Sequence, residues 1–402
     1  MALMPVAEAL ATVLADIAPL PEEMVALEAA HGRVLARDLT ALRTQPPAAM
    51  SAMDGYAVRA ADVTTVPTRL TVIGEVAAGR PFDRALREGE AARIFTGGVV
   101  PDGADAIIIQ EDTTREGDVV VIGEPARPGR HIRPAGTDFR ADDVLLRKGR
   151  RLTGRDLALA AAMNHPALPV HRRPKVALLA TGDELVAPGG DPGPGQIVCS
   201  NGYALRAMAE GEGAEVIDLG MVGDRLEETR AAIRRARDGG ANMLVTTGGA
   251  SVGDHDMVQA ALKAEGVEIA FWKVAIRPGK PVMNGRLGAM RVLGLPGNPV
   301  SSYICGFLFG VPLIRALSGR TEPLATETAI LAVELPANDS RQDYMRATLT
   351  NGPDGLPVAT PVGSQDSSLL RSLSNAGALI VRPPQAPAAA AGSRCVILKL
   401  PL

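Results

Sequence analysis

Three glycine-rich segments each follow a predicted strand and carry residue types that bind phosphate. They read ATGDELV (residues 180–186), TTGGASVGDHDM (246–257) and GLPGNPVSS (294–302). Each comes directly after a short apolar run, namely KVALLA, NMLVTT and RVLGLP. Ligands of open α/β sheets bind at the carboxyl ends of the strands. The segments therefore predict one crevice for a phosphate-bearing ligand.

The second segment has the features of an anion site at the start of a helix. Gly248, Gly249 and Gly253 let the main chain adopt positive φ and approach a ligand closely. Successive N–H groups at a helix start then form a nest for an anion. Asp254 and Asp256 begin that helix. The alternative is that an acid only caps the helix, but one cap does not need both carboxylates.

Acids in and near the first segment suggest a divalent cation beside the phosphate. Asp183 and Glu184 follow Gly182, and Mg²⁺ prefers such oxygen ligands together with phosphate oxygens. The alternative is that Thr181 or Asp183 serves only as a cap. Asp224 follows the next predicted strand, and three roles stay open for it: capping the following helix, contacting a ribose hydroxyl or binding the cation.

The third segment combines rigidity with hydroxyl groups. Pro296 and Pro299 stiffen the loop before a long helix, and Ser301 and Ser302 place hydroxyls at the helix start. A purely structural turn is the alternative.

Three cations lie close together in the segment WKVAIRPGKP. They are Lys273, Arg277 and Lys280, near the end of one predicted strand. A solvated basic face is the ordinary interpretation. A proline-glycine turn between two cations, however, suits a small oxyanion.

The middle of the chain predicts the sheet that positions these residues. From residue 174 to about 322, strands alternate with helices, which is typical of a doubly wound, mostly parallel sheet covered on both faces. The strands are expected at 175–180, 215–219, 242–247, 271–276 and 290–295. The helices are expected at 201–210, 226–238, before Glu265 and at 300–317.

The flanking regions are of a different type. Residues 46–137 and 323–402 contain short β-prone runs separated by glycine and proline, which predicts a β-rich domain and a small C-terminal β-barrel or sandwich. Residues 1–45 begin with a helix, and another helix starts near Thr153 and ends before Pro166.

Composition excludes several classes of protein. A net charge of -3 argues against a dedicated nucleic-acid binder. Three widely spaced cysteines form no disulfide framework, which fits a reducing cytosol. The N-terminus lacks the pattern of a signal peptide. The longest apolar run, 300–314, is shorter than the ~20 residues of a membrane span. We expect a soluble cytoplasmic protein without membrane or nucleic-acid partners.

Other catalytic motifs give no signal. No Walker A, GxSxG or dinucleotide-binding sequence stands in the required context. The five histidines show no metal-ligand spacing, and His255, between two acids, receives no role. Two further turns, SAMDGYAVRAADV (51–63) and RIFTGGVVPDGAD (93–105), indicate nothing more than turns when taken alone.

Taken together, these motifs resemble one family. MDGYA, FTGGxxP, GTDF, TGDEL, SNGY, TTGGASVGDHD, FWKVAIRPGKP and GLPGNPVSS occur in one order. This order is similar to that of the molybdopterin molybdenumtransferases, the MoeA-like enzymes that share the module with gephyrin. The resemblance covers essentially the whole chain, and it is loosest after residue 322.

The resemblance implies a four-domain protomer that forms a homodimer. Its domains would be an elongated linking and dimerisation domain (1–45 with 138–173), a β-rich domain (46–137), the doubly wound molybdopterin-binding domain (174–322) and a C-terminal β-barrel (323–402). The implied reaction inserts molybdenum from molybdate into adenylylated molybdopterin, with Mg²⁺-dependent release of AMP. Molybdopterin adenylyltransferase is the implied pathway partner.

The resemblance also assigns site residues, and it places the active site at the subunit interface. The implied catalytic residues are Asp54, Thr96, Asp138, Glu184, Asp224, Asp256 and Lys273. The implied binding residues are Arg133, Gly248, Gly249, Ser251, Gly253, Arg277, Lys280, Pro296, Pro299, Ser301, Arg346 and Ser367. The implied metal ligands are Glu184, Asp224 and Asp256. Arg277 stands where many relatives have lysine, and the two cations are not equivalent.

Two other functions compete with this one. A non-catalytic carrier would use the same pocket only to hold the pterin. A hydrolase similar to the competence-damage-type nucleotide pyrophosphatases would use the same doubly wound domain. MDGYA and the β-rich domain argue against the hydrolase.

Overall fold

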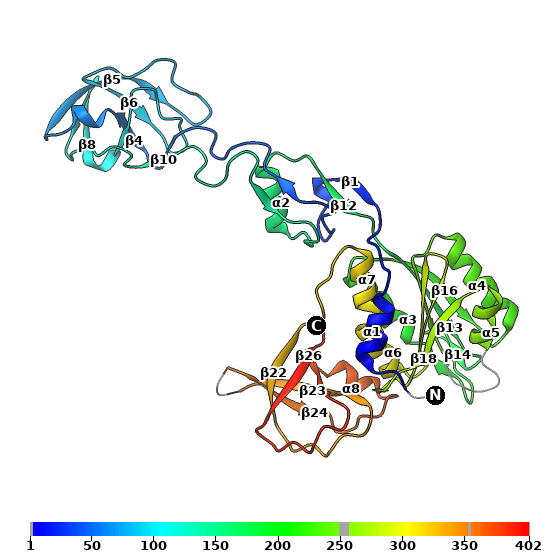
Figure 1. The fold of residues 1–402 in the computed structure, drawn as a ribbon. Coiled ribbons are helices and arrows are strands. Elements are labelled where there is room, and N and C mark those ends of the chain that lie inside the picture. The colour runs from blue at the N-terminus through cyan, green and yellow to red at the C-terminus, as the bar shows by residue number, and fades with distance from the viewer. Residues whose placement is uncertain (1–2, 249–256, 353–354, 402) are drawn as a thin grey trace. The chain divides into compact units, whose positions relative to one another are not determined.

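The computed structural model describes residues 3–248, 257–352 and 355–401 (Figure 1). The predicted site residues Gly249, Ser251, Gly253 and Asp256 lie outside the described residues. The chain divides into two compact units. The first contains Met1–Glu23, Gly32–Ala36 and Pro169–Leu402, and the second contains Met24–His31 and Arg37–Leu168.

A six-stranded mixed sheet is the centre of the first unit. Its strand order is β16-β13-β17-β21-β20-β18, and the first four strands are parallel. The antiparallel strand β20 was not predicted. The bounds are β13 (Lys175–Thr181), β16 (Glu215–Val222), β17 (Met243–Thr247), β18 (Glu268–Lys273), β20 (Pro281–Leu287) and β21 (Met290–Leu295).

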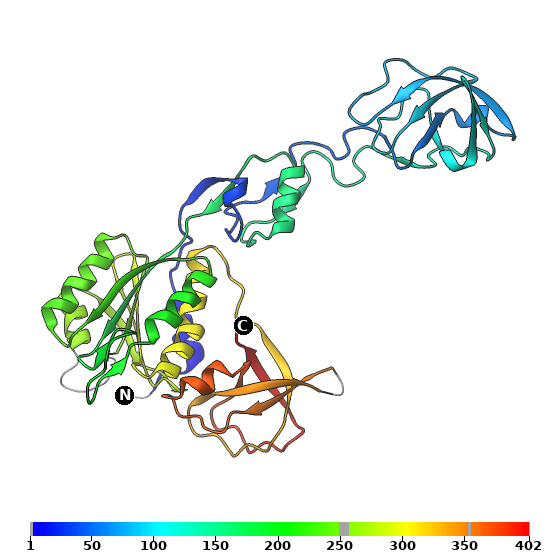
Figure 2. The same cartoon turned by 180° about the vertical axis from the view of Figure 1, so that it is seen from behind.

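Helices cover both faces of this sheet, as predicted (Figures 1 and 2). One face packs against α1 (Val6–Leu14) and α3 (Asn201–Gly211). The other packs against α4 (Leu226–Asp238) and α5 (Met257–Ala264). Because β13 and β17 are covered on both sides, their sequences are continuous apolar runs rather than alternating ones.

The long apolar segment is a core helix, as predicted. It consists of α6 (Pro299–Cys305), a π-helical turn η4 (Gly306–Gly310) and α7 (Val311–Leu317). By length and composition alone it could cross a membrane, but 83% of its apolar window is buried inside the protein. Burial among side chains of the core therefore explains its composition.

The C-terminal strands form a closed barrel, as predicted. The order β23-β24-β22-β26-β25 returns to β23 through the pairing of β23 with β25. A short strand, β19 (Ile276–Arg277), pairs with β23 and joins the segment that carries Arg277 to the barrel. The bounds are β22 (Thr326–Leu331), β23 (Gln342–Asn351), β24 (Pro357–Pro361), β25 (Ala378–Arg382) and β26 (Arg394–Lys399).

Shorter elements of the first unit surround these two layers. The first glycine-rich segment leads into β14 (Leu185–Val186) and β15 (Ile197–Val198), which pair with each other before α3 begins. Helix α8 (Leu370–Ser374) follows the barrel loop 364–369, and β12 (Ala167–His171) precedes the sheet.

The second unit contains a six-stranded β-sheet of order β7-β4-β6-β5-β9-β8, which confirms the predicted β-rich region. Its bounds are β4 (Gly55–Val58), β5 (Thr68–Val76), β6 (Glu90–Ile94), β7 (Ala106–Ile109), β8 (Thr113–Glu116) and β9 (Val119–Ile122). The remaining elements are β1 (Glu22–Ala26), β2 (Leu39–Thr40), β3 (Met50–Ser51), β10 (Ile132–Arg133), β11 (Val144–Leu146) and α2 (Gly154–Ala162).

Helix α1 lies in the core of the first unit, where Val6, Ala9 and Val13 are buried. The resemblance implies that residues 1–45 belong to the linking domain, and the four-domain division stays a prediction. The fold class itself, a doubly wound sheet with a β-rich region and a C-terminal barrel, is confirmed.

Candidate functional site

The three glycine-rich segments meet at one edge of the sheet. Strands β13, β17 and β21 are parallel neighbours, and they end at Thr181, Thr247 and Leu295. Their carboxyl ends therefore lie side by side, as the sequence predicted.

Gly248 allows the segments to touch. Its φ is +87°, and a Cβ at this position would lie 2.2 Å from the carbonyl oxygen of Thr181. A Cβ on Gly297 would lie 3.6 Å from the Cα of Gly248. A residue with a side chain at position 248 would meet both an unfavourable dihedral angle and a collision with main chain.

A cavity of about 1170 Å³ lies where these segments meet the barrel. This volume is sufficient for a large ligand, since small-molecule pockets usually measure roughly 300–1,000 Å³. Eight predicted site residues line it: Glu184, Gly248, Arg277, Lys280, Pro296, Pro299, Ser301 and Ser367. Lys273, Asp224 and Arg346 are not among its lining residues.

Arg277 is bound by acids of the barrel segment. Its Nε lies 2.9 Å from a carboxylate oxygen of Asp343, and its Nη2 donates both to the same oxygen and, at 3.1 Å, to Asn338. Asp339 is a further partner at 3.4 Å. Hydrogen bonding to Asp343 raises the pKa of Arg277. The charge of Arg277 is therefore largely balanced within the protein.

Lys280 differs from Arg277 in its surroundings. It is exposed, it lines the cavity, and within the described part of the chain it makes no ion pair with a carboxylate. Its ammonium group is consequently available to an anion in the cavity.

Arg346 is a buried clamp beside the cavity. Only 1% of it is exposed, although it carries a full charge. Its guanidinium donates to the carbonyls of Ser364 (3.2 Å), Asp366 (3.0 Å) and Leu369 (3.3 Å). Its main-chain N–H donates to Gln365 Oε1 at 3.0 Å. These bonds hold the barrel loop 364–369 against β23.

The same loop is also joined to the third glycine-rich segment. Asn298 Nδ2 donates to Ser367 Oγ at 2.9 Å, and the N–H of Val300 donates to the Ser367 carbonyl at 3.0 Å. Ser301 lines the cavity from the first turn of α6, whereas the hydroxyl of Ser302 is buried without a partner among the described residues. Ser301 and Ser367 thus both lie at the cavity.

The first segment and the turn after β16 are linked through their acids. Asp183 accepts a hydrogen bond from the N–H of Asp224 at 3.2 Å. Helix α4 begins after Arg225 without a side-chain cap, so the interpretation of Asp224 as the cap of this helix was wrong. The first segment continues into a strand, so no helix is capped there either.

The acids suit a magnesium ion that also binds phosphate. Among the described residues no three acids, histidines or cysteines form a metal-binding group, and Asp256 lies outside that set. Mg²⁺ usually takes only one or two carboxylates and completes its shell with water and phosphate oxygens. Glu184 lines the cavity, and Asp224 is exposed at the same strand edge, so both are suitable oxygen donors.

In the second unit, Asp54 and Thr96 form a pair, although they come from separate motifs. The main-chain N–H and the hydroxyl of Thr96 both donate to one carboxylate oxygen of Asp54, each at 2.7 Å. These two bonds lower the pKa of Asp54. Arg93 stacks on the rings of Tyr56 and Phe95, at 5.2 and 4.9 Å from their centres.

The other two predicted site residues of this unit are exposed. Arg133 lies on β10, which pairs with β3, and Asp138 donates its N–H to the Gln45 carbonyl at 3.0 Å. Their functional roles stay predictions.

Sequence analysis missed the residues that position the site. Asn298, Gln365 and Asp343 make the bonds described above, yet none was singled out. Asn298 lies inside the GLPGNPVSS motif, which was a usable signal. Gln365 and Asp343 lie in the loosely matching C-terminal region and had no local signal.

Three family profiles match the chain in order. Residues 4–164 match the MoeA N-terminal region (domain I and II). Residues 177–316 match a probable molybdopterin binding domain. Residues 328–400 match the MoeA C-terminal region (domain IV).

Whole proteins agree with these profiles. The chain is 36% identical to the molybdopterin molybdenumtransferase of Haemophilus influenzae over 366 residues, which cover 90% of each chain. It is 37% identical to that of Nostoc sp. over 392 residues, covering 94% of this chain and 89% of the relative. The solved structure of the molybdopterin biosynthesis moeA protein from Pyrococcus horikoshii matches with a TM-score of 0.85 and 30% identity, covering 99% of this chain and 100% of that one. The chain therefore belongs to the MoeA family of molybdopterin molybdenumtransferases.

Proposed function

We propose that this protein inserts molybdenum from molybdate into adenylylated molybdopterin and releases AMP. The observation that carries the proposal is the cavity in which the described parts of the three glycine-rich segments meet Ser301, Ser367 and Lys280, which makes no ion pair with any described carboxylate. Family membership supports the same reaction, since the relatives are named molybdopterin molybdenumtransferases.

Lys280, Ser301 and Ser367 form the proposed oxyanion site. An ammonium group and two hydroxyls supply donors to the oxygens of a tetrahedral dianion, and charge-assisted bonds of this kind are the strong ones. Arg277 orients the loop before Lys280 through Asp343, and Arg346 holds the loop that carries Ser367. Both arginines thus act through the main chain that they position.

The phosphoanhydride of the substrate would lie along the glycine-rich segments. In this proposal, main-chain N–H groups of these segments would bind the phosphate oxygens, which adds no charge that must be neutralised. Gly248 keeps the segments close enough to act on one ligand.

We propose Glu184, Asp224 and Asp256 as the carboxylates that hold Mg²⁺. When bound, Mg²⁺ withdraws charge from the anhydride and stabilises the departing AMP. Lys273, on β18, is a further catalytic residue by family resemblance.

Assembly and partners are part of the proposal. Asp54, Thr96, Arg133 and Asp138 would complete the site of a partner subunit in a homodimer, which would place the active site at the subunit interface. Adenylylated molybdopterin would come from a molybdopterin adenylyltransferase. The chain is a soluble enzyme of its family, and we propose that it acts in the cytoplasm.

The test measures AMP release from adenylylated molybdopterin with and without molybdate and with and without Mg²⁺. We expect release only when both are present. Equal release without molybdate would refute the proposed coupling, and equal release after removal of Mg²⁺ by a chelator would refute the metal requirement.

A second assay separates the enzyme from a carrier. Asp256→Asn and Glu184→Gln should greatly reduce AMP release while pterin binding is retained, because they remove a charge and keep the shape. If release is unchanged in both variants, the pocket serves as a carrier site and these acids do no chemistry.

A further inference from the structure

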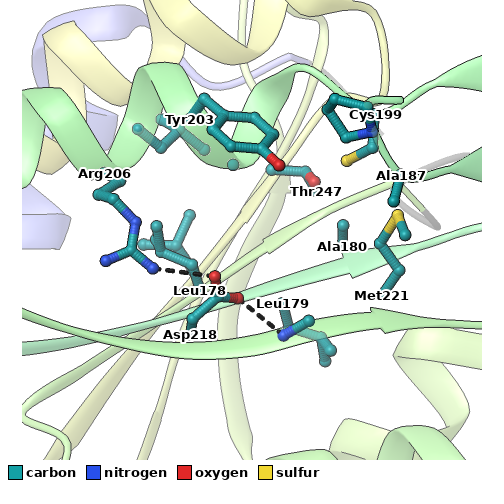
Figure 3. A pocket seen from close by; sticks show the side chains of 15 residues that line it. Leu178, Leu179, Ala180, Ala187, Cys199, Tyr203, Arg206, Asp218, Met221 and Thr247 are labelled. Atoms are coloured by element: carbon teal, nitrogen blue, oxygen red, sulfur yellow. Dashed lines mark hydrogen bonds and ion pairs between the residues drawn. The ribbon is translucent and has the colours of Figure 1, made fainter. Parts of the chain in front are cut away.

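A second, smaller cavity of about 150 Å³ adjoins the large one (Figure 3). It lies between α3 and the sheet, on the face that carries Leu178, Ala180 and Val245. Cys199 and Thr247 line both cavities, so the two are neighbours. The proposed oxyanion site and metal ligands do not use this smaller space.

The smaller cavity has the form of a slot with apolar walls. Leu178 and Val245 are 6% and 4% exposed and form its floor on the sheet. Tyr203 on α3 lies opposite, and 61% of it is exposed (Figure 3). A large aromatic side chain left in solvent beside an apolar floor is a ready stacking surface for a flat ring.

One end of the slot is polar. Asp218 accepts a hydrogen bond from Arg206 at 2.9 Å and, on its other oxygen, from the N–H of Gly220 at 2.8 Å. Each carboxylate oxygen has a second lone pair, so Asp218 retains acceptor capacity. Figure 3 shows this ion pair at one end of the slot, with Cys199 and Met221 at the other.

A β-bulge forms this polar end. Leu178 pairs with Asp218, but Ala180 pairs with Met221, so β16 holds one extra residue. Gly220 takes up the extra length with a φ of +79°. Bulges redirect side chains and are frequent beside active sites. Here the bulge supplies the N–H that holds the Asp218 carboxylate at the slot.

We infer that this slot binds a planar nitrogen heterocycle that carries an exocyclic amino group. The inference rests on the proposed function. Its substrate contains two such rings, a purine and a pterin, joined through the anhydride that the neighbouring loops would hold. The ring stacks on Tyr203, and its amino group donates to Asp218.

The size of the cavity agrees with this occupant. A closed apolar cavity of about 150 Å³ holds a benzene-sized ring. Cys199 and Thr247 line both this slot and the larger cavity, so a fused second ring can extend toward that cavity. A sugar or a polyphosphate would not offer an apolar surface to pack against the floor.

The experiment measures binding of AMP and, separately, of 6-hydroxymethylpterin to the full chain by calorimetry. Tyr203→Ala should weaken binding of one ring about two- to tenfold, as expected for a lost aromatic pair, and Tyr203→Phe should restore it. Asp218→Asn should weaken binding of the same ring. Val396→Ala, on the exposed barrel surface, is the matched control and should change neither affinity.

The outcomes are distinct. Loss of AMP binding alone assigns the slot to the purine, and loss of pterin binding alone assigns it to the pterin. If the wild-type chain binds neither ring, or if neither ring responds to Tyr203→Ala and Asp218→Asn, the inference is wrong. Molybdate-dependent AMP release by the wild-type chain is measured in parallel, so that failure of the slot is distinguished from failure of the proposed function.

Discussion

Two regions line the large cavity, and they are positioned in different ways. At the sheet edge, the ends of parallel strands and the absence of a side chain at Gly248 bring the loops together. At the barrel, loop 364–369 is held by side chains, above all by buried Arg346. The main chain organises the first region, and side-chain hydrogen bonds, chiefly those of the Arg346 guanidinium, organise the second. The barrel side should therefore be more sensitive to the loss of a single side chain.

The largest expected effect comes from Arg346→Ala. The variant would remove three hydrogen bonds from a buried charged group, and each bond of this kind contributes about 1.5–3 kcal/mol. We expect the first unit to lose at least about 3 kcal/mol of unfolding free energy and AMP release to fall by about 100-fold or more. Thermal denaturation and the AMP assay measure these changes.

Arg346→Lys serves as the milder companion variant. Lysine keeps the charge but lacks the planar fork that reaches three carbonyls. We expect this variant to fold. Hydrogen exchange should be faster at the N–H of Val300, which donates to the Ser367 carbonyl. If Arg346→Lys has the exchange rate and the activity of the wild type, the loop does not depend on this clamp.

Gly248→Ala tests the sheet edge. Positive φ costs a residue with a side chain roughly 1–2 kcal/mol. The collision with the Thr181 carbonyl adds to this cost and displaces the loop. We expect AMP release to fall about tenfold or more.

Gly288→Ala is the control for this variant, because Gly288 has a φ of +58° and open space around it. It should lose stability but keep its turnover. Equal loss of turnover in both variants would mean that strain, and not the contact between loops, matters.

Lys280→Ala removes a cation that lines the large cavity and has no carboxylate partner in the described parts of the chain. A hydrogen bond to a charged group contributes about 1.5–3 kcal/mol, so the KM for molybdate should rise roughly 10- to 100-fold. Lys263→Ala, an exposed lysine on α5, is the matched control and should leave this KM unchanged. An unchanged KM in Lys280→Ala would remove Lys280 from the oxyanion site.

The smallest effect is expected for Thr96→Val in the second unit. Two bonds from Thr96 lower the pKa of Asp54, and the variant removes the one from the hydroxyl. The pKa of Asp54 should therefore rise toward its ordinary value. A carboxyl-carbon NMR titration measures this change.

The sign of the pH effect follows from the lowered pKa of Asp54. The pair stabilises the fold above the unfolded pKa of about 3.9. That stabilisation is lost as the pH falls through the lower folded pKa. A titration identical in wild type and variant would show that the hydroxyl does not contribute.

The sheet edge could be predicted from sequence because short apolar runs mark its strands and because these strands alternate regularly with helices. The apolar runs before Thr181, Thr247 and Leu295 mark buried parallel strands, and their order brings the loops to one edge. Strand β20 was missed because its buried residues include Asn284.

The barrel side could not be predicted in the same way. The resemblance implied that Arg346 is a binding residue, and its sequence position suggested no other role. Its actual partners are main-chain carbonyls, which have no sequence signature. Likewise, the acids that bind Arg277 lie some sixty positions away from it in the sequence, and Asp343 is one of them.

The most direct test of the central claim is the position of molybdenum in crystals of the chain soaked with molybdate. Anomalous scattering at the molybdenum edge locates the atom without ambiguity. We predict a site bounded by Lys280, Ser301 and Ser367, with Arg346 still bound to the carbonyls of loop 364–369. Molybdenum bound elsewhere, or bound directly by a reoriented Arg346, would contradict the account.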